Sequence, residues 1–331
     1  MTADATRRRL AIGLDIGGTK VLGVAVDQES GRLLAEHKVP TVPREDRVVE
    51  TLGAVADRLV DEVTTADGRA PVVSAAGLGA PGLVDRSGTL RYGANLPGVV
   101  DAPLGRRLAE RLGVAVAVDN DATCAAWGEH ELGAARGHNH SITITLGTGI
   151  GAGITARGRV LRGANGFAGE PGHMLVDPAG PPCPCGRRGC WERYGSGSGL
   201  GRLGREAVAA GRGARILQLA GGDVEQVVGE HVSAAAAEGD ADALAVLDRF
   251  GWWVAAGSAN LVDLLDTEIV VLGGGLVDIG ELLLDPVRRH FAAQLYGVGR
   301  RPEVPIVAAQ LGSRAGAIGA ALLGLERREG P

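Results

Sequence analysis

The fold of this chain is decided by residues 12–27, which read IGLDIGGTKVLGVAVD. Two short apolar runs rich in branched residues stand on either side of a turn with two glycines, and this pattern predicts a β-hairpin. Residues 32–39 predict a third strand. Over residues 44–64 apolar side chains recur at helical spacing, which indicates an amphipathic helix. The chain therefore opens with three strands and a helix.

The same design returns at residues 142–155, ITITLGTGIGAGIT, as strand, glycine turn and strand. When LDIGGT at 14–19 is set beside ITLGTG at 144–149, the two halves look like copies of one unit. Two copies that face each other would hold two glycine hairpins across one cleft. The sequence therefore predicts two related domains that flank a cleft.

Strand and helix patterns alternate along the rest of the chain, which is typical of an α/β protein. Late in the chain a helix leads into an apolar strand and then Gly273, Gly274 and Gly275. A strand that ends in a glycine turn is where open α/β sheets bind ligands. The further predicted elements are strands 71–78, 114–118, 268–272 and 304–309 and helices 103–112, 121–132, 244–265 and 315–325.

Length and charge limit the classes of protein that remain. The 331 residues exceed the roughly 250 to 300 at which a single core stops growing, so two domains are expected. The formal net charge is −5 and the one block of positive residues is Arg7–Arg9, so no nucleic acid partner is indicated. The apolar run after it breaks at Asp15, too early for a secretion signal, and no run approaches the roughly 20 residues that cross a bilayer. A cytoplasmic protein with no membrane partner is predicted.

Three of the four cysteines crowd into CPCGRRGC, downstream of His173. In a cytosolic chain such crowding favours metal ligation over a disulfide. The thiolates of Cys183, Cys185 and Cys190 and one imidazole would complete a tetrahedron around zinc. Because four protein ligands leave no open position for a substrate, the predicted zinc is structural. The alternative is three reduced cysteines without a ligand.

Asn120, Asp121 and Ala122 follow a predicted strand and begin a predicted helix. One interpretation of the aspartate is a cap on the first helical turn. The other is catalytic, because a carboxylate at a strand end facing a cleft can accept a hydroxyl proton during phosphoryl transfer. Taken alone, these residues leave both interpretations open.

The first glycine turn, GGTK at 17–20, suits phosphate binding, because absent side chains let backbone N–H groups approach phosphate and Thr19 adds a donor. It is not a Walker loop, since Thr19 and Lys20 stand in the reverse order and a strand follows instead of a helix. A plain hairpin turn is the alternative for one copy. The recurrence of the turn at Gly147, Thr148 and Gly149 favours phosphate binding.

Together these residues resemble the ROK family of repressors and sugar kinases, within the actin-like ATPase superfamily, and most closely its bacterial ATP-dependent glucokinases. The resemblance implies an actin-like, ribonuclease H-like α/β fold. It also implies a small domain at 8–120, with a helix at 312–328 packing back on it, and a large domain at 121–311 with the zinc motif. The motifs that carry the resemblance are LDIGGTK at 14–20, GAPG at 79–82, ANLP at 94–97, NDA at 120–122, TLGTG at 145–149, GEPGH at 169–173 and residues 183–192.

The resemblance implies transfer of the γ-phosphate of Mg-ATP to the 6-hydroxyl of glucose, with Asp121 as the base, by a homodimer or homotetramer. His173 would hold zinc with one ring nitrogen and reach the sugar with the other. Asp15 would lie near magnesium. The implied sugar ligands are Asn95, Asn120, Asp121, Glu170, His173 and Glu192. The implied nucleotide-binding residues are Asp15, Gly17, Gly18, Thr19, Lys20, Gly147, Thr148, Gly149, Gly273, Gly274 and Gly275.

Two positions depart from the family pattern: Val99 stands where glucokinase-like members often have Trp, and Gly199 where Ala is usual. The first leaves open kinases for fructose, mannose or N-acetylmannosamine. Polyphosphate is the alternative donor, although related polyphosphate enzymes lack the cysteine cluster. A non-catalytic sugar sensor is disfavoured because Asp121 is present. A repressor is disfavoured because about nine residues precede the first strand, too few for a DNA-binding head.

Overall fold

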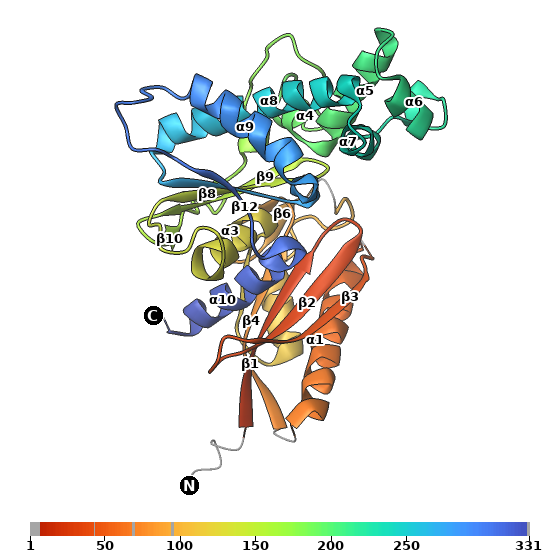
Figure 1. The fold of residues 1–331 in the computed structure, drawn as a ribbon. Helices are drawn as coiled ribbons and strands as arrows, with labels where there is room; N and C mark the ends of the chain where they lie inside the picture. The colour runs from red at the N-terminus through yellow and green to blue at the C-terminus, as the bar shows by residue number, and fades with distance from the viewer. Residues whose placement is uncertain (1–6, 43, 68–69, 94–95, 330–331) are drawn as a thin grey trace. The chain divides into compact units, whose positions relative to one another are not determined.

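The structure is a computed structural model and describes residues 7–42, 44–67, 70–93 and 96–329 (Figure 1). Asn95, one of the predicted sugar ligands, lies outside the described residues. The chain folds into two compact units. Unit 1 contains Met1–Arg136, Gly153–Gly169 and Leu311–Pro331, and unit 2 contains Gly137–Ala152 and Glu170–Gln310.

Unit 1 is built on a five-stranded sheet in the order β3-β2-β1-β4-β7. β1 and β2 pair antiparallel from Leu10 opposite Asp27 to Ile16 opposite Val21, which confirms the first predicted hairpin. β1, β4 and β7 run parallel, so their carboxyl ends meet at one edge of the sheet. The strands of unit 1 are β1 (Arg7–Ile16), β2 (Lys20–Asp27), β3 (Leu33–Pro40), β4 (Ala70–Ala80), β7 (Val116–Asn120) and the small pair β5 (Leu83–Val84) and β6 (Leu90–Tyr92).

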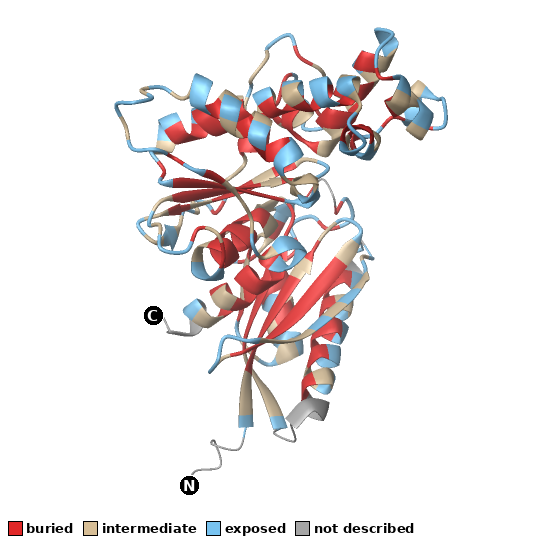
Figure 2. Cartoon of the chain, viewed as in Figure 1, coloured by how far each residue is buried: buried red, intermediate tan, exposed pale blue. Residues whose placement is uncertain are grey.

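Helices cover both faces of this sheet. One side of α1 is buried with the β1 residues that alternate from Leu10 to Ile16, and Figure 2 shows this buried stripe along the helix. On the other face α10 packs so closely that a Cβ at Gly13 would lie 1.8 Å from the carbonyl oxygen of Ala317. Bare glycine is therefore required there. The helices of unit 1 are α1 (Glu45–Asp67), α2 (Leu104–Leu112), α3 (Asp121–Leu132), η5 (Gly312–Arg314) and α10 (Ala315–Glu329).

A second five-stranded sheet has the order β10-β9-β8-β11-β12, the same arrangement as the first. β8 runs parallel to β11, and β11 to β12, while β9 and β10 are antiparallel. The predicted α/β class and the internal duplication are confirmed. The strands are β8 (Ser141–Leu146), β9 (Ile150–Ala156), β10 (Arg159–Val160), β11 (Ile269–Gly273) and β12 (Ile306–Ala308).

Unit 2 adds a group of helices around α8. Trp191 is fully buried and donates from Nε1 to the carbonyl oxygen of Trp253 at 2.7 Å, and Tyr194 stacks on the Trp253 ring at 4.0 Å. The chain just after the last cysteine is therefore seated on α8. The helices of unit 2 are η2 (Pro171–His173), α4 (Glu192–Gly195), α5 (Gly197–Ala209), α6 (Ala214–Leu219), η3 (Val224–Gln226), α7 (Gly229–Ala237), α8 (Ala241–Leu265), η4 (Gly275–Ile279) and α9 (Glu281–Gln294).

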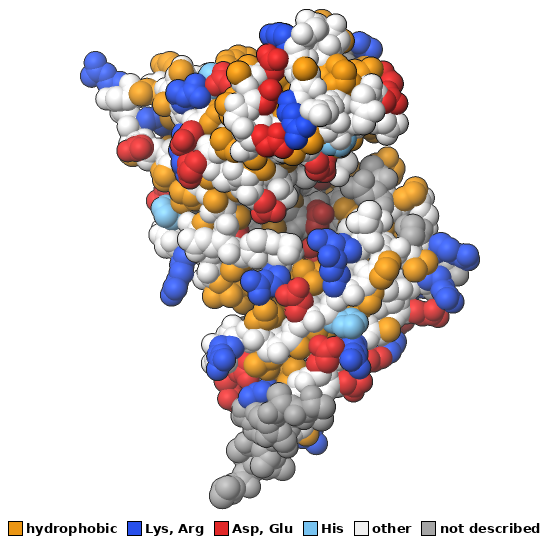
Figure 3. All heavy atoms as spheres, turned by 45° about the vertical axis from the view of Figure 1, so that its right-hand side comes forward, with side chains coloured by type: hydrophobic (Ala, Val, Ile, Leu, Met, Phe, Trp, Pro, Cys, Tyr) orange, Lys and Arg blue, Asp and Glu red, His pale blue; other side chains and the backbone are white. Residues whose placement is uncertain are grey.

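The predicted domain limits, 8–120 and 121–311, and the predicted cleft stay predictions. By contacts, the helix α3 groups with unit 1 because it packs along α10. On the face drawn in Figure 3, acidic and basic side chains are interspersed over the surface. Among the described residues, no helix combines the length and the apolar character that crossing a membrane would need.

Candidate active site and candidate metal centre

Asn120 and Asp121 stand where β7 ends and α3 begins. The Asn120 side chain is the helix cap, because its Oδ1 accepts from the backbone N–H groups of Ala122 at 2.9 Å and Thr123 at 3.1 Å. Its Nδ2 donates to the carbonyl oxygen of Gly82 at 3.1 Å. Asn120 is thus the N-cap, and the Asp121 carboxylate accepts at Oδ1 from the same Ala122 N–H at 2.8 Å, which leaves its other oxygen for chemistry.

The carboxylates of Asp15 and Asp121 lie close together in unit 1. Asp15 at the end of β1 stands opposite Gly79 on β4, and a Cβ at Gly79 would lie 3.5 Å from Asp15 Oδ1 and 3.3 Å from the Asp121 Cα. Gly79 thus lies against both acids, and the Asp121 charge acts on the Asp15 carboxylate. These two carboxylates form the acidic centre of unit 1.

Burial gives both acids unusual proton affinities. It raises the pKa of Asp15 to about 7, with the Asp121 charge adding to the rise and Lys20 opposing it. Burial also raises the pKa of Asp121, although a hydrogen bond from the Ala122 backbone works in the other direction. Both residues remain partly open to solvent. A carboxylate with a raised pKa and an open side suits general base catalysis near neutral pH.

The two glycine turns are closed by their own backbones. Gly17 N–H donates to the carbonyl oxygen of Lys20 at 2.8 Å, and Gly147 N–H donates to that of Gly149 at 3.1 Å. A Cβ at Gly147 would meet no heavy atom within 4 Å, and its φ is outside the left-handed region. Since the fold does not require glycine at that position, its smallness can serve a ligand that approaches the backbone.

The other predicted nucleotide residues lie beside these turns or at the end of β11. Gly18 and Thr19 are exposed in the first turn, and the β1–β2 turn is tied to Thr41, whose Oγ1 donates to the Gly17 carbonyl oxygen at 2.7 Å. Gly273 ends β11 opposite Thr145. The three-glycine run therefore lies next to the end of β8, which leads into the second turn. The remaining residues of this set are Lys20, Thr148, Gly274 and Gly275.

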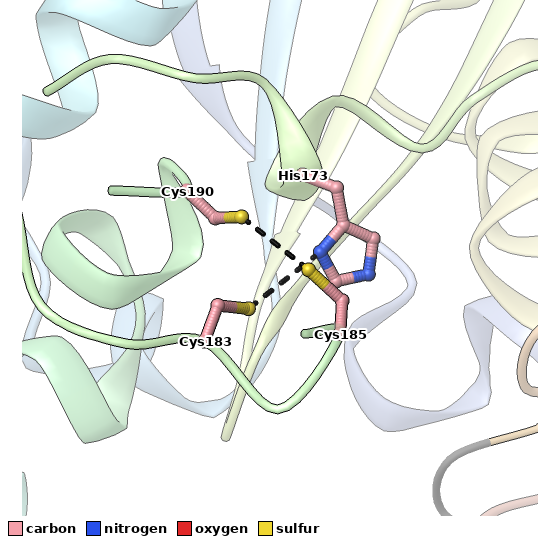
Figure 4. Close-up of side chains that lie close together, drawn as sticks. All are labelled: His173, Cys183, Cys185 and Cys190. Carbon is pink, nitrogen blue, oxygen red and sulfur yellow. Dashed lines mark hydrogen bonds between the residues drawn. The ribbon is translucent and has the colours of Figure 1, made fainter. Parts of the chain in front are cut away.

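The four predicted metal ligands come together in unit 2 (Figure 4). Their donor atoms all lie within 4.8 Å of one another. Cys183 Sγ is 4.0 Å from His173 Nδ1, and Cys185 Sγ is 3.5 Å from Cys190 Sγ. A tetrahedral zinc with bonds of roughly 2.0 to 2.3 Å needs donor atoms about 3.5 to 3.8 Å apart. The residues fit zinc in both donor type and spacing.

The loop that holds these cysteines is shaped by its own backbone. Cys183 N–H donates to the carbonyl oxygen of Arg187 at 2.7 Å, which folds the loop back on itself. Burial raises the pKa of Cys183 and Cys190, whereas for Cys185 hydrogen bonds from Arg187 and the neighbouring cysteines overcome burial and lower the pKa to about 7. One thiol of the cluster is thus close to ionisation at neutral pH.

Glu192 connects the cluster of candidate metal ligands to the second glycine turn. Its Oε1 accepts from Cys183 Sγ at 3.0 Å and lies 3.7 Å from His173 Nδ1. A Cβ at Gly149 would lie 2.8 Å from its Oε2. Because Nδ1 of His173 faces the sulfurs, Nε2 is the ring nitrogen left for another ligand. Glu170 lies just before this histidine, at the start of η2.

Sequence reasoning missed residues that support the second turn. Gly197 N–H donates to the Gly147 carbonyl oxygen at 2.7 Å, and Ser198 Oγ donates to that of Thr148 at 2.8 Å. The start of α5 therefore holds this turn in place. The available signal was SGSG at 196–199, a run of serines and glycines that follows the cysteine motif at a helix start.

One of the two departures from the family pattern, Gly199, has a structural explanation, and nothing in the structure explains Val99. A Cβ at Gly199 would lie 2.6 Å from the carbonyl oxygen of Tyr194, so glycine fits the close approach there. Val99 is fully buried in the core of unit 1.

The ROK family model matches residues 11–327 of this chain. The chain belongs to the ROK family. It is 39% identical over 321 residues to the glucokinase of Streptomyces coelicolor, covering 96% of this chain and 98% of that protein. It is 36% identical to the glucokinase of Thermotoga maritima, covering 96% and 97%.

Among solved structures, this ROK protein is similar to a ROK family glucokinase from Streptomyces griseus in complex with glucose and AMPPNP. The identity is 41%, the TM-score is 0.83, and the match covers 97% of this chain and 100% of that one. This likeness confirms the predicted family and its actin-like α/β fold.

Proposed function

We propose that this ROK protein is a glucokinase that transfers the γ-phosphate of ATP to the 6-hydroxyl of glucose. The observation that carries the proposal is Asp121, a partly open carboxylate with a raised pKa at the end of a parallel strand, in the fold of a ROK glucokinase. Phosphoryl transfer to an alcohol needs a base at the hydroxyl and positioned charge at the phosphates. The chain offers residues for both tasks.

In the proposed reaction Asp121 accepts the proton of the sugar 6-hydroxyl as that oxygen bonds to the γ-phosphorus of ATP. The bond from the γ-phosphorus to the bridging oxygen breaks, and ADP leaves with the electron pair. The raised pKa strengthens Asp121 as a base as long as the group is ionised at the working pH. The N-cap role of Asn120 keeps the aspartate at the strand end.

The two glycine turns are proposed to bind phosphate through backbone N–H groups, with Thr19 and Thr148 as side-chain donors. Asp15 is the residue that would hold Mg²⁺, which neutralises phosphate charge when bound. The glycines that follow β11 are proposed to border adenosine. The complete proposed nucleotide set is Asp15, Gly17, Gly18, Thr19, Lys20, Gly147, Thr148, Gly149, Gly273, Gly274 and Gly275.

The sugar ligands are proposed to be Asn95, Asn120, Glu170, His173 and Glu192, together with the base. Carboxylates accept strong hydrogen bonds from sugar hydroxyls because they are charged. Zinc bound by the cluster would fix the ring orientation of His173, so that Nε2 can face the sugar. The oligomeric state and the cytoplasmic location stay predictions.

The test is a coupled assay of the purified protein across hexoses, each with ATP and with polyphosphate. Glucose with ATP is expected to give the highest kcat/KM. N-acetylmannosamine, fructose and mannose test the alternative acceptors, and polyphosphate tests the alternative donor. A clear preference for any other pair would replace the proposed substrates. No turnover with any hexose would remove the kinase proposal altogether.

A further inference from the structure

A buried ion pair stands directly beside the proposed base. Asp119, the residue before Asn120 at the end of β7, accepts at Oδ2 from Arg162 Nε at 2.6 Å. Its Oδ1 accepts from the Asn120 backbone N–H at 2.9 Å. The Asp119 side chain is 7% exposed and that of Arg162 is 35% exposed. A carboxylate this buried needs a charged partner, and Arg162 supplies it from 43 positions along the chain.

Arg162 begins a loop of unit 1 that is tied to other elements of the same unit at two points. The loop closes on itself where Ala168 N–H donates to the Arg162 carbonyl oxygen at 3.2 Å. From the turn between β5 and β6, Arg86 donates through Nε to the carbonyl oxygen of Ala164 at 2.9 Å and through Nη2 to that of Gly163 at 2.5 Å. Arg162 therefore links the loop to the end of β7, and Arg86 binds the loop from the β5–β6 turn.

The loop connects two parts of the proposed site along the chain. At its start, Arg162 pairs with Asp119, two positions before Asp121. At its end, the chain continues through Gly169 directly into Glu170, a proposed sugar ligand. A shift of this loop would therefore also move the backbone of Glu170.

We propose that Asp119 and Arg162 are positioning residues for the acceptor sugar. The pair holds the loop 162–168 against the end of β7, and the loop in turn sets the position of the Glu170 backbone. Neither side chain has to contact the substrate. The proposal rests on the proposed function and deepens it, because it assigns acceptor affinity, rather than nucleotide affinity, to a pair that no motif marks. A misplacement of about 1 Å in a positioning element can cost about a hundredfold.

The test compares Arg162→Met, Arg162→Lys and the double variant Asp119→Asn with Arg162→Met. The control is Arg58→Gln, which removes an exposed ion pair with Glu62 on α1 of the same unit. For each protein, the KM for glucose, the KM for ATP and kcat are measured by coupled assay. Glucose binding is measured without ATP by calorimetry, and stability by the thermal midpoint.

Arg162→Met is expected to raise both the KM and the Kd for glucose at least tenfold, with the KM for ATP within twofold of the unaltered protein. Its thermal midpoint should fall because Asp119 is left buried without its partner. The double variant removes that uncompensated charge, so its midpoint should recover while glucose binding stays weak. Arg162→Lys should restore part of the glucose affinity, and the control should match the unaltered protein.

A pair that serves stability alone gives a different result. The proposal is overturned if the double variant binds glucose within twofold of the unaltered protein. It is also overturned if Arg162→Met raises the KM for glucose and the KM for ATP equally. If Arg162→Met does not fold, the double variant and Arg162→Lys make the same comparison. The proposed function fails separately: an unaltered protein that binds glucose without phosphorylating it refutes the kinase, and the binding ratios still test the pair. If it neither binds nor phosphorylates any hexose, both proposals fall.

Discussion

The two sheets share one strand order but differ in the chemistry at their strand ends. In the first sheet Asp15 on β1 stands opposite Gly79 on β4. In the second, Thr145 on β8 stands opposite Gly273 on β11. The glycine is present in both copies, whereas the carboxylate occurs in one. The same backbone frame therefore carries an acidic strand end in one copy and a neutral one in the other.

This difference shows how two copies of one fold can carry different chemistry at matching positions. Carboxylates accept protons and hold cations, but they repel phosphate at short range. A neutral strand end leading into a glycine turn can approach phosphate without that cost. Both glycine turns are proposed to bind phosphate. The first copy also carries the carboxylate proposed to hold the metal, whereas the second has a neutral residue at the matching strand end.

Removing the base should have the largest effect. Asp121→Asn keeps the size of the side chain but cannot take up the hydroxyl proton, so kcat should fall by about three orders of magnitude or more. Calorimetry should show glucose binding within a few-fold of the unaltered protein. Glu131→Gln, on the exposed side of the same helix, is the control and should keep full turnover. Near-normal turnover in Asp121→Asn would remove it as the base.

Breaking the candidate metal cluster should come next, because Glu192 links it to the second glycine turn. Cys185→Ser is expected to lose bound zinc and to lower the thermal midpoint, since metal binding contributes to folding. Elemental analysis and thermal unfolding measure the two effects. The matched control is Cys124→Ser, which changes a cysteine outside the cluster, so this variant protein should retain bound zinc. Absence of zinc from the unaltered protein would refute the site.

Making the second strand end acidic tests the division of labour directly. Thr145→Asp places a carboxylate at the position that matches Asp15 and should raise the KM for ATP about ten- to a hundredfold. Thr145→Ser keeps the position neutral and should change it less than threefold. Steady-state kinetics at varied ATP with saturating glucose give both values. An unchanged KM for ATP in Thr145→Asp would mean that the neutral end is not needed for phosphate.

The smallest effect should appear in stability against pH. Because the pKa of Asp15 is raised to about 7, the folded state keeps a proton that the unfolded state has lost between about pH 4 and 7. The free energy of unfolding of the ligand-free protein therefore falls as the pH rises through this window. Asp15→Asn should remove roughly 2 to 4 kcal/mol of that pH dependence and raise the stability at pH 8.

Asp85 provides a control of opposite sign for this measurement. Burial is outweighed there by hydrogen bonds from Ser87, Thr89 and Arg91, which lower its pKa to about 2. Its contribution to stability is present above about pH 4 and is lost as the pH falls toward 2, so Asp85→Asn should destabilise the protein at pH 7. Denaturant unfolding at several pH values measures both variants. An identical pH slope in Asp15→Asn and the unaltered protein would contradict the raised pKa.

Much of the fold and the grouping of the four candidate metal ligands could be predicted because the signals are local. The hairpins, the strand that ends in Asn120 and the cysteine spacing each lie within a few residues of sequence. The pairing of Asp119 with Arg162 could not be predicted, since the partners are far apart and each looks like an ordinary surface charge. The choice of Asn120 over Asp121 as the cap also depends on side-chain geometry that the sequence leaves open.

The packing of α10 on the first sheet has a consequence for synthesis of the chain. The face of β1 and β2 that carries Ala11, Leu22 and Val24 is covered by residues near 317 to 321. A ribosome that has made every strand of the first sheet has not yet made its cover, and all of unit 2 emerges in between. The apolar face therefore lacks its native cover, α10, until the chain is nearly complete, and unit 2 can reach its native state before the first-made strands do.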